Sequence, residues 1–384
     1  MMNLEMALER AGSIAAGVIA EEAPIVDREG VWPERGIHAL QAAGLAGLVL
    51  PEAVGGHGHG LLAVAKICQV LGRVCPSTAI SFGMHLVGSA VIAAKATPEQ
   101  RRRYLEPIAR GEHLTTLALS EPGTGSHFYI PETRIEPTER GFVLDGKKSF
   151  VTNGSQVDSY VVSAVSAGAS AQPGEFSCAV VRKESPGLAW GPQWTGWGMR
   201  GNSARNVTLS GVAIERSDLL GEEGDEIWYV FHVVAPFFLM AMAGTYLGVA
   251  ESALEVGRRH LLERTYSHTG TSLAENGLLQ HRLGTLWAQV HRTRAFLEDA
   301  ARLGDSGHAD ALPALCSSKA EVAETAERVT AEVMTLLGGR GYAAGSHVQQ
   351  LYRDVRAAHV MSPTTDILRT WTGRAILGLP ILGD

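Results

Sequence analysis

The chain is 384 residues long, with 45% hydrophobic and 19% charged residues, which is ordinary globular composition and enough for two or three domains. Its formal net charge of −7, without a strong basic run, argues against a nucleic-acid-binding surface. The four cysteines have no metal-ligand spacing, so we expect no metal site and a reducing, cytoplasmic location. Glu5, Glu9 and Arg10 interrupt any apolar core of a signal peptide, which fits that location.

Residues 1–115 are predicted to form an N-terminal helical domain. Apolar residues at helical spacing predict helices over 4–19, 37–46, 61–74 and 79–94. Thr97-Pro98-Glu99-Gln100 combines a threonine cap, a proline at the first helical position and a glutamine at the third. We therefore expect a short basic helix to begin at Pro98 and to end at about Pro107.

Near residue 115 the apolar pattern changes from helical to strand-like, and residues 116–222 are predicted to form an antiparallel β-domain. Asp145-Gly146 lies between two apolar runs, which predicts a β-hairpin with its turn at these two residues. Further strands are expected over 160–165, 176–181 and 204–214.

Residues 223–384 are predicted to be helical again. Long patterned segments cover 226–263, 278–304, 311–337 and 346–378. Gly338-Gly339 ends the third segment and Ser346 is placed to cap the fourth. Four long helices with short connections favour an up-down four-helix bundle.

One apolar run in this region is long enough to cross a bilayer, because residues 227–250 contain no Asp, Glu, Lys or Arg. No Lys/Arg cluster marks a cytoplasmic side, and the helical pattern continues into Glu251, Glu255 and Arg258. We therefore expect a helix that is buried in a bundle or a subunit interface, not a membrane span.

The stretch from Arg353 to Trp371 predicts one helix, a break and a second helix. Pro363 stops the first helix, because proline has no N–H to donate and disfavours helix at the residue before it. Ser362 is the predicted N-cap of the second helix, with Pro363 as its first residue. A helix N-terminus can hold a phosphate, but these residues alone favour an ordinary kink between two bundle helices.

Two glycine-containing motifs are candidates for ligand binding. Residues 120–126, SEPGTGS, offer glycines for close backbone approach and hydroxyl donors, yet they suit a simple turn equally well. Residues 339–345 have the spacing GxGxxxG and follow a helix, not a strand. We therefore interpret them as a helix–helix turn and not as a dinucleotide-binding motif.

Several specific segments, in this order, resemble the acyl-CoA dehydrogenase family over essentially the whole chain. They are GLAGLVLPEAVGGHG (44–58), RRYLEPIARGE (102–112), LALSEPGTGS (117–126), DGKKSFVTNGS (145–155), GMRGNSARNV (198–207), GEEGDEI (221–227) and LLGGRGY with QQLYRDVR (336–356). The resemblance implies an α+β protein with an N-terminal helical domain, a middle antiparallel β-barrel and a C-terminal four-helix bundle. It also implies a homo-oligomer, either a dimer or a tetramer built as a dimer of dimers, with FAD between the β-domain and the bundle.

Position by position, the resemblance assigns contacts with FAD. Within one subunit these residues are Ser120, Gly125, Ser126, Phe150, Thr152, Thr364 and Asp366. Phe150 stands where many members have a tryptophan beside the flavin ring. Arg264 and the pair Gly338-Gly339 match residues that reach the FAD of a neighbouring subunit.

The catalytic position departs from the family. Ser362 stands where the usual enzyme carries the glutamate that removes the α-proton of the thioester, and a serine hydroxyl is far too weakly basic for that task. Some members carry the glutamate on the first long bundle helix, where this chain has about Phe238. The loop over 265–277 also lacks the Phe-Gly of the family, and Thr335 replaces a glutamine.

The resemblance therefore implies a FAD-dependent oxidoreductase that oxidises an acyl thioester, on CoA or on a carrier protein, with a non-standard base. An electron-transfer flavoprotein or oxygen would accept the electrons. Two alternatives stay open: a flavin-dependent monooxygenase on the same fold, and a catalytically degenerate flavoprotein kept for binding or assembly.

Overall fold

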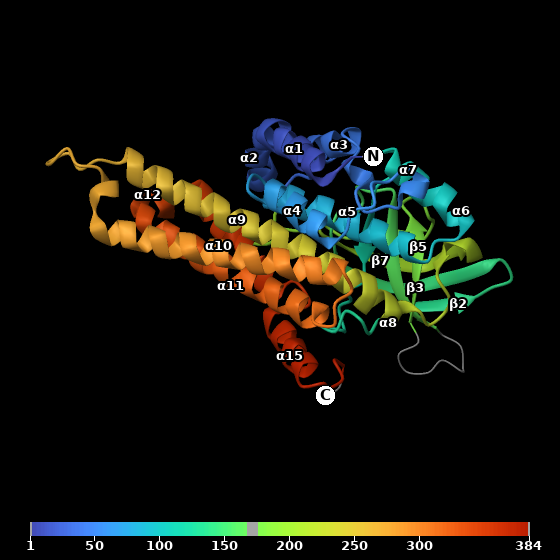
Figure 1. The fold of residues 1–384 in the computed structure, drawn as a ribbon. Helices are drawn as coiled ribbons and strands as arrows, with labels where there is room; N and C mark the ends of the chain where they lie inside the picture. The colour runs from blue at the N-terminus through green and yellow to red at the C-terminus, as the bar shows by residue number, and fades with distance from the viewer. Residues whose placement is uncertain (1, 167–175, 383–384) are drawn as a thin grey trace.

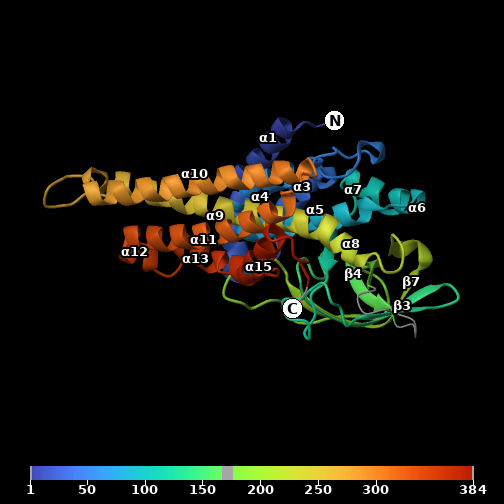
Figure 2. The ribbon, with the colours of Figure 1, turned by 60° about the horizontal axis from the view of Figure 1, so that its bottom comes forward.

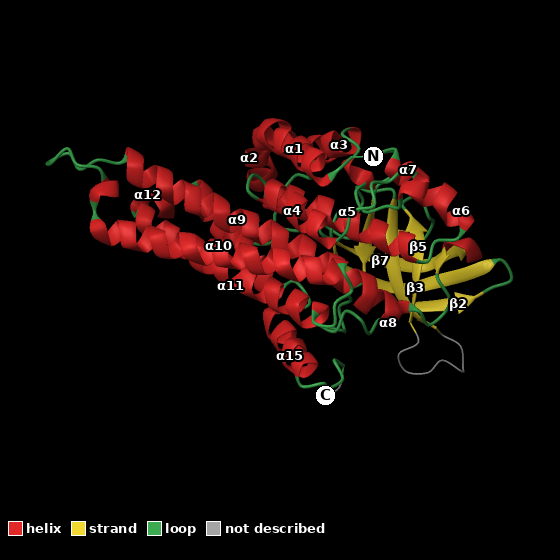
Figure 3. Ribbon diagram, in the orientation of Figure 1, coloured by secondary structure: helices red, strands yellow, loops and turns green. Residues whose placement is uncertain are grey.

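The computed structural model describes residues 2–166 and 176–382. The strands gather at one end of the molecule and the long helices extend away from them (Figures 1 and 3). The N-terminal region is helical, as predicted, with element bounds that differ by a few residues. Its helices are α1 (Leu4–Ile14), α2 (Ala20–Glu29), α3 (Glu34–Ala42), α4 (Leu61–Gly72), α5 (Pro76–Ala94), α6 (Pro98–Gln100) and α7 (Glu106–Ala109).

The predicted cap at Thr97 is confirmed. Gln100 N donates to Thr97 Oγ1 and Gln100 Oε1 accepts from Thr97 N, so the two residues satisfy each other. The chain stays helical through residues 101–105 into α7, so the expected end at Pro107 is wrong. Pro107 lies inside this continuous helical stretch, directly after its π-helical turn Arg101–Leu105.

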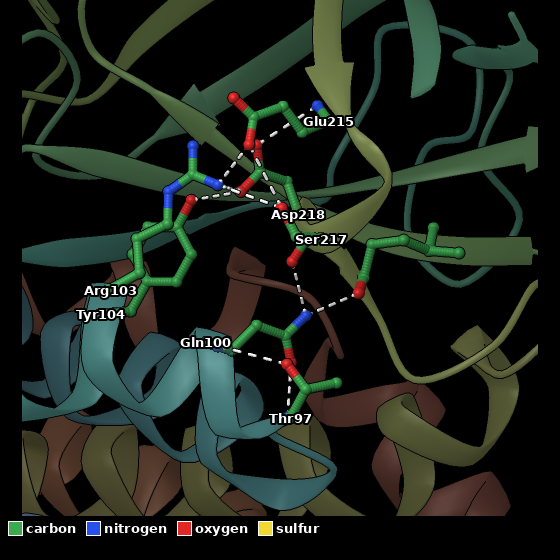
Figure 4. Close-up of polar contacts among 8 residues, drawn as sticks. Thr97, Gln100, Arg103, Tyr104, Glu215, Ser217 and Asp218 are labelled. Atoms are coloured by element: carbon green, nitrogen blue, oxygen red, sulfur yellow. Dashed lines mark hydrogen bonds and ion pairs between the residues drawn. The ribbon is translucent and has the colours of Figure 1, made fainter. Parts of the chain in front are cut away.

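These short helices are fastened to the sheet by side chains (Figure 4). The buried Gln100 donates from Nε2 to Ser217 O at 2.9 Å and to Leu219 O at 2.7 Å. The Tyr104 hydroxyl donates to Asp218 Oδ1 at 2.5 Å. The amide of Gln100 thus both completes a helix cap and fixes the angle between α6 and the sheet.

Replacing Gln100 with alanine is expected to lower the free energy of unfolding by about 2–3 kcal/mol, because it removes the cap partner of Thr97 and leaves two carbonyls without their donor. Urea unfolding followed by circular dichroism measures the change. Glu99→Ala, at the exposed neighbouring position, is the matched control and should stay within about 0.5 kcal/mol of wild type. A loss of unfolding free energy in Gln100→Ala as small as that in the control would contradict a role of Gln100 in joining α6 to the sheet.

The sheet contains β1 (Thr115–Ala118), β2 (Arg134–Pro137), β3 (Gly141–Val151), β4 (Ser159–Ser166), β5 (Phe176–Arg182), β6 (Leu188–Trp190), β7 (Arg205–Glu215) and β8 (Leu219–Leu220). Its order is β6-β7-β3-β2-β4-β5-β8, and β1 pairs with β4. The predicted antiparallel pairing is found for β2–β3, β3–β7, β4–β5, β5–β8 and β6–β7. It is wrong for β4 against β1 and β2, to both of which β4 runs parallel. Within the described part of the chain the sheet does not close, so the expected barrel is not confirmed.

The predicted hairpin at Asp145-Gly146 is also wrong, since both residues lie inside the single strand β3. The register of β3 against β7 shifts between Leu144 and Gly146, and Asp145 Oδ1 accepts a hydrogen bond from Gly211 N at 2.8 Å. A Cβ on Gly146 would lie 2.4 Å from Thr133 Oγ1. Asp145-Gly146 therefore lies at an irregularity within the strand and not at a turn. Glycine is suited to this position because the backbone near Thr133 comes too close for a side chain.

The C-terminal region is helical, as predicted, and three of its helices match the expected segments closely (Figure 2). They are α8 (Glu226–Tyr229), α9 (Ala235–Glu263), α10 (Gly277–Asp305), α11 (Ala311–Leu337), α12 (Gly339–Tyr342), α13 (His347–Val355), α14 (Ala357–Val360) and α15 (Thr365–Ile376). Helices α9, α10 and α11 pack on one another, and α13 and α15 pack on α11. The domain bounds at 115/116 and 222/223 stay predictions; β1 begins at Thr115 and α8 at Glu226.

Two helices are long and apolar enough to span a membrane by length and composition: Pro76–Ala94 and Ile227–Glu263. Their most apolar windows are 89% and 83% buried inside the fold. The second includes the run singled out in the sequence, and its backbone touches α4: a Cβ on Gly244 would lie 2.1 Å from Ala65 O. This burial agrees with a core helix, and the absence of a membrane span stays a prediction.

The break before α15 is present, but its cap is not the predicted one. Thr364, not Ser362, caps α15, with Thr364 Oγ1 accepting from Ile367 N at 3.5 Å. Pro363 lies outside the helix, joined to Ser362 by a cis peptide bond. If Pro363 were the first helical residue, its carbonyl would accept from Ile367 N. Instead Pro363 O accepts from Lys319 Nζ at 3.0 Å, and Ile367 N donates to Thr364 Oγ1.

Candidate active site

The ends of two strands bring the first group of predicted residues together. Ser149 N, in β3, donates to Ser120 O at 2.8 Å, and Thr116 Oγ1, in β1, donates to Thr152 O at 3.0 Å. The loop that follows β1 and the turn that follows β3 are therefore neighbours. Ser120, Phe150 and Thr152 therefore lie close together where β1 and β3 end, and their contact with a flavin stays a prediction.

A buried ion pair anchors the SEPGTGS loop from below. The Glu121 carboxylate accepts from the backbone N–H groups of Glu132 and Thr133, at 2.6 and 3.1 Å, and from Lys148 Nζ at 2.5 Å. Both charged side chains are almost completely buried, and Lys148 also donates to Leu119 O and Ser163 Oγ. The base of the loop is thus fixed, while its tip at Gly125 and Ser126 stays accessible.

The turn after β3 is held in an unusual conformation. Phe150, Asn153 and Ser155 have positive φ angles of 55°, 61° and 65°, and the side chain of Asn153 bridges two segments of the N-terminal region. Asn153 Nδ2 donates to Ser81 O at 2.8 Å, and Asn153 Oδ1 accepts from the indole N–H of Trp32 at 2.9 Å. The ring of Phe150 is left 63% exposed and meets Trp194 edge-on. Strained positions of this kind concentrate at ligand sites.

Aromatic contacts bring the bundle to the same place. Tyr129, just beyond the SEPGTGS loop, lies 5.9 Å from Trp371 of α15 and 6.2 Å from Phe231, measured between ring centres. Helix α15 begins just after the capping Thr364, and Asp366 is exposed in its first turn. The second group of predicted residues therefore belongs to a helix that packs against the loop carrying the first.

Helix α13 ties the bundle to the segment before β7. Asp354 Oδ1 accepts from Met199 N at 2.6 Å, and the Arg353 guanidinium donates to Trp197 O at 2.9 Å while pairing with Asp27. Complete burial raises the pKa of the Asp354 carboxyl to about 7, although the Met199 N–H opposes the shift.

Because the pKa of Asp354 is higher in the folded than in the unfolded chain, its contribution to stability is complete below about pH 4 and is lost as pH rises through about 7. We expect the wild-type chain to lose about 2 kcal/mol more than Asp354→Asn between pH 5 and pH 8. The asparagine keeps an acceptor for Met199 N–H but carries no charge. Urea unfolding at the two pH values measures the difference, with the exposed Asp299→Asn as control. Equal losses in wild type and Asp354→Asn would contradict the assignment.

The third group of predicted residues lies elsewhere. Arg264 follows the end of α9, and Gly338 ends α11 with φ 58°, at the end of the long helices remote from the sheet (Figure 1). A Cβ on Gly338 or Gly339 would meet nothing within 4 Å, so packing within this chain does not require glycine there. One chain does not bring Arg264, Gly338 and Gly339 to the sheet edge.

The buried side chains that fix the backbone of the site, which are Glu121, Lys148 and Lys319, were not identified from the sequence. Glu121 and Lys148 were visible in the SEPGTGS and DGKKSF segments, but their pairing joins the loop after β1 to strand β3. Lys319 had a signal: in α11 it shares the buried face with Leu315, Cys316 and Ala323, and a lysine on an apolar face needs a partner.

Comparison with known proteins identifies the fold family. Family models for the N-terminal, middle and C-terminal domains of acyl-CoA dehydrogenase match residues 3–112, 116–212 and 239–377. Cyclohex-1-ene-1-carbonyl-CoA dehydrogenase of Geobacter metallireducens is 31% identical over 375 residues, which cover 97% of each chain. The chain belongs to the acyl-CoA dehydrogenase family. Acyl-CoA dehydrogenases are flavin-dependent oxidoreductases that act on CH–CH groups, so the predicted enzyme class is confirmed.

Solved acyl-CoA dehydrogenase structures show the same fold. Butyryl-CoA dehydrogenase from Megasphaera elsdenii superposes with a TM-score of 0.91 at 22% identity, over 97% of this chain and 98% of that one. The FAD complex of PigA superposes with a TM-score of 0.89 at 21% identity, over 98% and 97%.

The residues at the sheet edge fit a flavin. Among the described residues, the hydroxyls of Ser120, Ser126 and Thr152 have no hydrogen-bond partner, so they are available to a polar ligand. The exposed ring of Phe150 offers an apolar face, and the missing Cβ of Gly125 faces open space. Free hydroxyl donors beside an apolar ring suit a molecule that joins a planar ring system to phosphates.

Proposed function

We propose that this chain is a FAD-dependent oxidoreductase that oxidises an acyl thioester, carried by CoA or by a carrier protein, without a glutamate at position 362. The observation that carries the proposal is the group of unpartnered hydroxyls and the exposed Phe150 ring where the SEPGTGS loop, the end of β3 and α15 converge. Ser120, Gly125, Ser126, Phe150 and Thr152 would hold the flavin.

Bound FAD would accept hydride from the carbon chain of the thioester. The residues of the chain would bind FAD and orient it. The Glu121–Lys148 pair keeps the loop in place. The N-terminus of α15, capped by Thr364, has free N–H groups and a positive dipole end, which would suit the phosphates of FAD. Asp366 would contact FAD from the first turn of that helix.

The proton must leave by another route than the usual glutamate. Ser362 is half-buried with a hydroxyl that has no partner among the described residues, and Phe238 is an apolar, half-buried side chain. The Geobacter relative is named for a cyclohex-1-ene-1-carbonyl thioester, whose α-carbon carries no hydrogen. A substrate of that kind would give a base facing the α-carbon nothing to remove, which supports an unsaturated or otherwise acidified thioester here.

Arg264 and Gly338-Gly339 lead us to propose a homo-oligomer, a dimer or a tetramer, in which these residues serve the flavin of a neighbouring chain. Their exposure at the far end of the long helices supports this. Arg264→Ala should then weaken FAD binding without changing the fold, as flavin fluorescence titration would show. A cytoplasmic location and transfer of electrons to an electron-transfer flavoprotein or oxygen complete the proposal.

The test is spectroscopic. The purified protein, loaded with FAD, is mixed anaerobically with saturated and α,β-unsaturated acyl-CoA and acyl-carrier thioesters, and the loss of flavin absorbance is recorded. Bleaching by a thioester supports the proposal, and the panel tells CoA from carrier. No bleaching, with hydroxylated product when reduced flavin and oxygen are supplied, would identify a monooxygenase instead. A protein that does not bind FAD would be a degenerate member.

A further inference from the structure

Helix α11 carries a lysine in the interior of the bundle. Lys319 is 1% exposed, and its ammonium donates to Ala358 O at 2.6 Å, Pro363 O at 3.0 Å and Met361 O at 3.4 Å. An ammonium has three N–H donors, and here each meets a backbone carbonyl. Burial lowers the pKa of this amine to about 7, whereas the three acceptors favour its charged form.

The three carbonyls have one thing in common: they surround Ser362. Ala358 O belongs to the last turn of α14, Met361 O precedes Ser362 directly, and Pro363 O follows it. A cation at a helix C-terminus satisfies carbonyls that have no partner in the helix. Lys319 extends that arrangement past the helix end and fixes the path of the chain up to the cap of α15.

Other contacts hold the two ends of this segment, but not its centre. Met361 N donates to Ala357 O at 3.0 Å, and Thr365 Oγ1 lies 3.1 Å from His359 Nδ1. The Tyr246 hydroxyl contacts Met361 Sδ at 3.7 Å. Within the part of the chain that the structure describes, the bonds that carbonyls on both sides of Ser362 accept from a side chain come from Lys319.

We propose that Lys319 is a positioning residue that fixes the Met361–Pro363 segment, and with it the Ser362 position, against the substrate. The proposal rests on the proposed function for its catalytic part, because it takes this segment to face the thioester. Lys319 itself contacts neither substrate nor flavin. It acts through the backbone, and the precision of that backbone decides whether the substrate's carbon chain meets the flavin productively.

The test compares Lys319→Met with Thr330→Val in FAD-loaded protein. Methionine keeps an unbranched side chain, one atom shorter than lysine, and removes the three donors. Thr330 lies on the same helix and is equally buried, and its hydroxyl donates to Ala326 O and Glu327 O of α11. We therefore expect its loss to affect the helix but not the segment. Amide hydrogen exchange over 357–368 is followed by mass spectrometry, and kcat and KM are measured with whichever thioester bleaches the wild type.

For Lys319→Met we expect roughly tenfold faster exchange in the segment and a fall in kcat of about 10–100-fold, with KM and FAD affinity within about threefold of wild type. Thr330→Val should leave exchange in the segment and kcat close to wild type. Unchanged exchange in Lys319→Met would overturn the proposal, and so would faster exchange with kcat intact.

If Lys319→Met does not fold, Lys319→Gln gives the same test in a milder form, since its amide keeps two N–H donors on a side chain one atom shorter. We then expect an intermediate rise in exchange and an intermediate fall in kcat; wild-type values for both would overturn the proposal. If no thioester reduces the wild-type flavin, the proposed function fails, while the exchange measurement still decides whether Lys319 holds the segment.

Discussion

Replacing Ser362 with glutamate is expected to raise the rate of flavin reduction by saturated acyl-CoA thioesters by roughly 10²–10⁴-fold, the usual contribution of a positioned general base. The serine hydroxyl cannot accept the proton at neutral pH, whereas a half-buried carboxylate has its pKa shifted upwards towards the working range. Stopped-flow absorbance under anaerobic conditions measures the rate.

Ser362→Gln is the control, because it has the same size as the glutamate and no basic group. The prediction requires that Ser362→Glu be fast and Ser362→Gln be as slow as wild type. If both variants are slow while FAD stays bound, position 362 does not face the α-carbon of the thioester. If both are fast, side-chain size and not basicity is responsible.

Lys148→Met is expected to lower the free energy of unfolding by about 3–5 kcal/mol, since it leaves the Glu121 carboxylate buried without its cation. The backbone N–H groups of Glu132 and Thr133 still reach the carboxylate, so we expect the chain to fold. Urea unfolding gives the stability, and flavin fluorescence titration is expected to show weaker FAD binding as the SEPGTGS loop loosens.

The exposed neighbour supplies the control: Lys147→Met should change stability by less than about 0.5 kcal/mol. Combining Lys148→Met with Glu121→Gln should cost less than the two single changes together, because the second change removes the uncompensated charge left by the first. Additive losses would mean that the two groups do not act as a pair.

Local signals in the sequence predicted the helices well and the sheet less well. Caps such as Thr97 and stops such as Gly338 are set by residues within one turn, and the structure confirms both. The Asp145-Gly146 signal failed because the register between β3 and β7, which is set far along the chain, decides its conformation. The predicted cap at Ser362 failed for a similar reason: Lys319, 44 residues from Pro363, binds the Pro363 carbonyl that the predicted first turn would use.

The candidate site, too, was predicted only in part from the sequence. The motif resemblance found residues that face outwards, such as Ser120, Phe150 and Thr152, because each lies in a recognisable segment. It did not find the groups that hold those segments. Lys319 bonds to carbonyls 39 to 44 residues away, and Glu121 pairs with a lysine 27 residues away. Local residue spacing therefore cannot predict either contact.

The close backbone contact between α4 and α9 bears on how the chain can be divided. A Cβ on Gly244 would lie 2.1 Å from Ala65 O, and one on Gly248 would lie 2.4 Å from Gln69 O, so the two helices touch backbone to backbone at these positions. Their side chains belong to one continuous apolar core that runs from Met2 to Trp371. A fragment ending near residue 115 would carry α4 and α5 with their apolar surface bare to water. We therefore expect the three regions that the family models match to unfold together and not as separate domains.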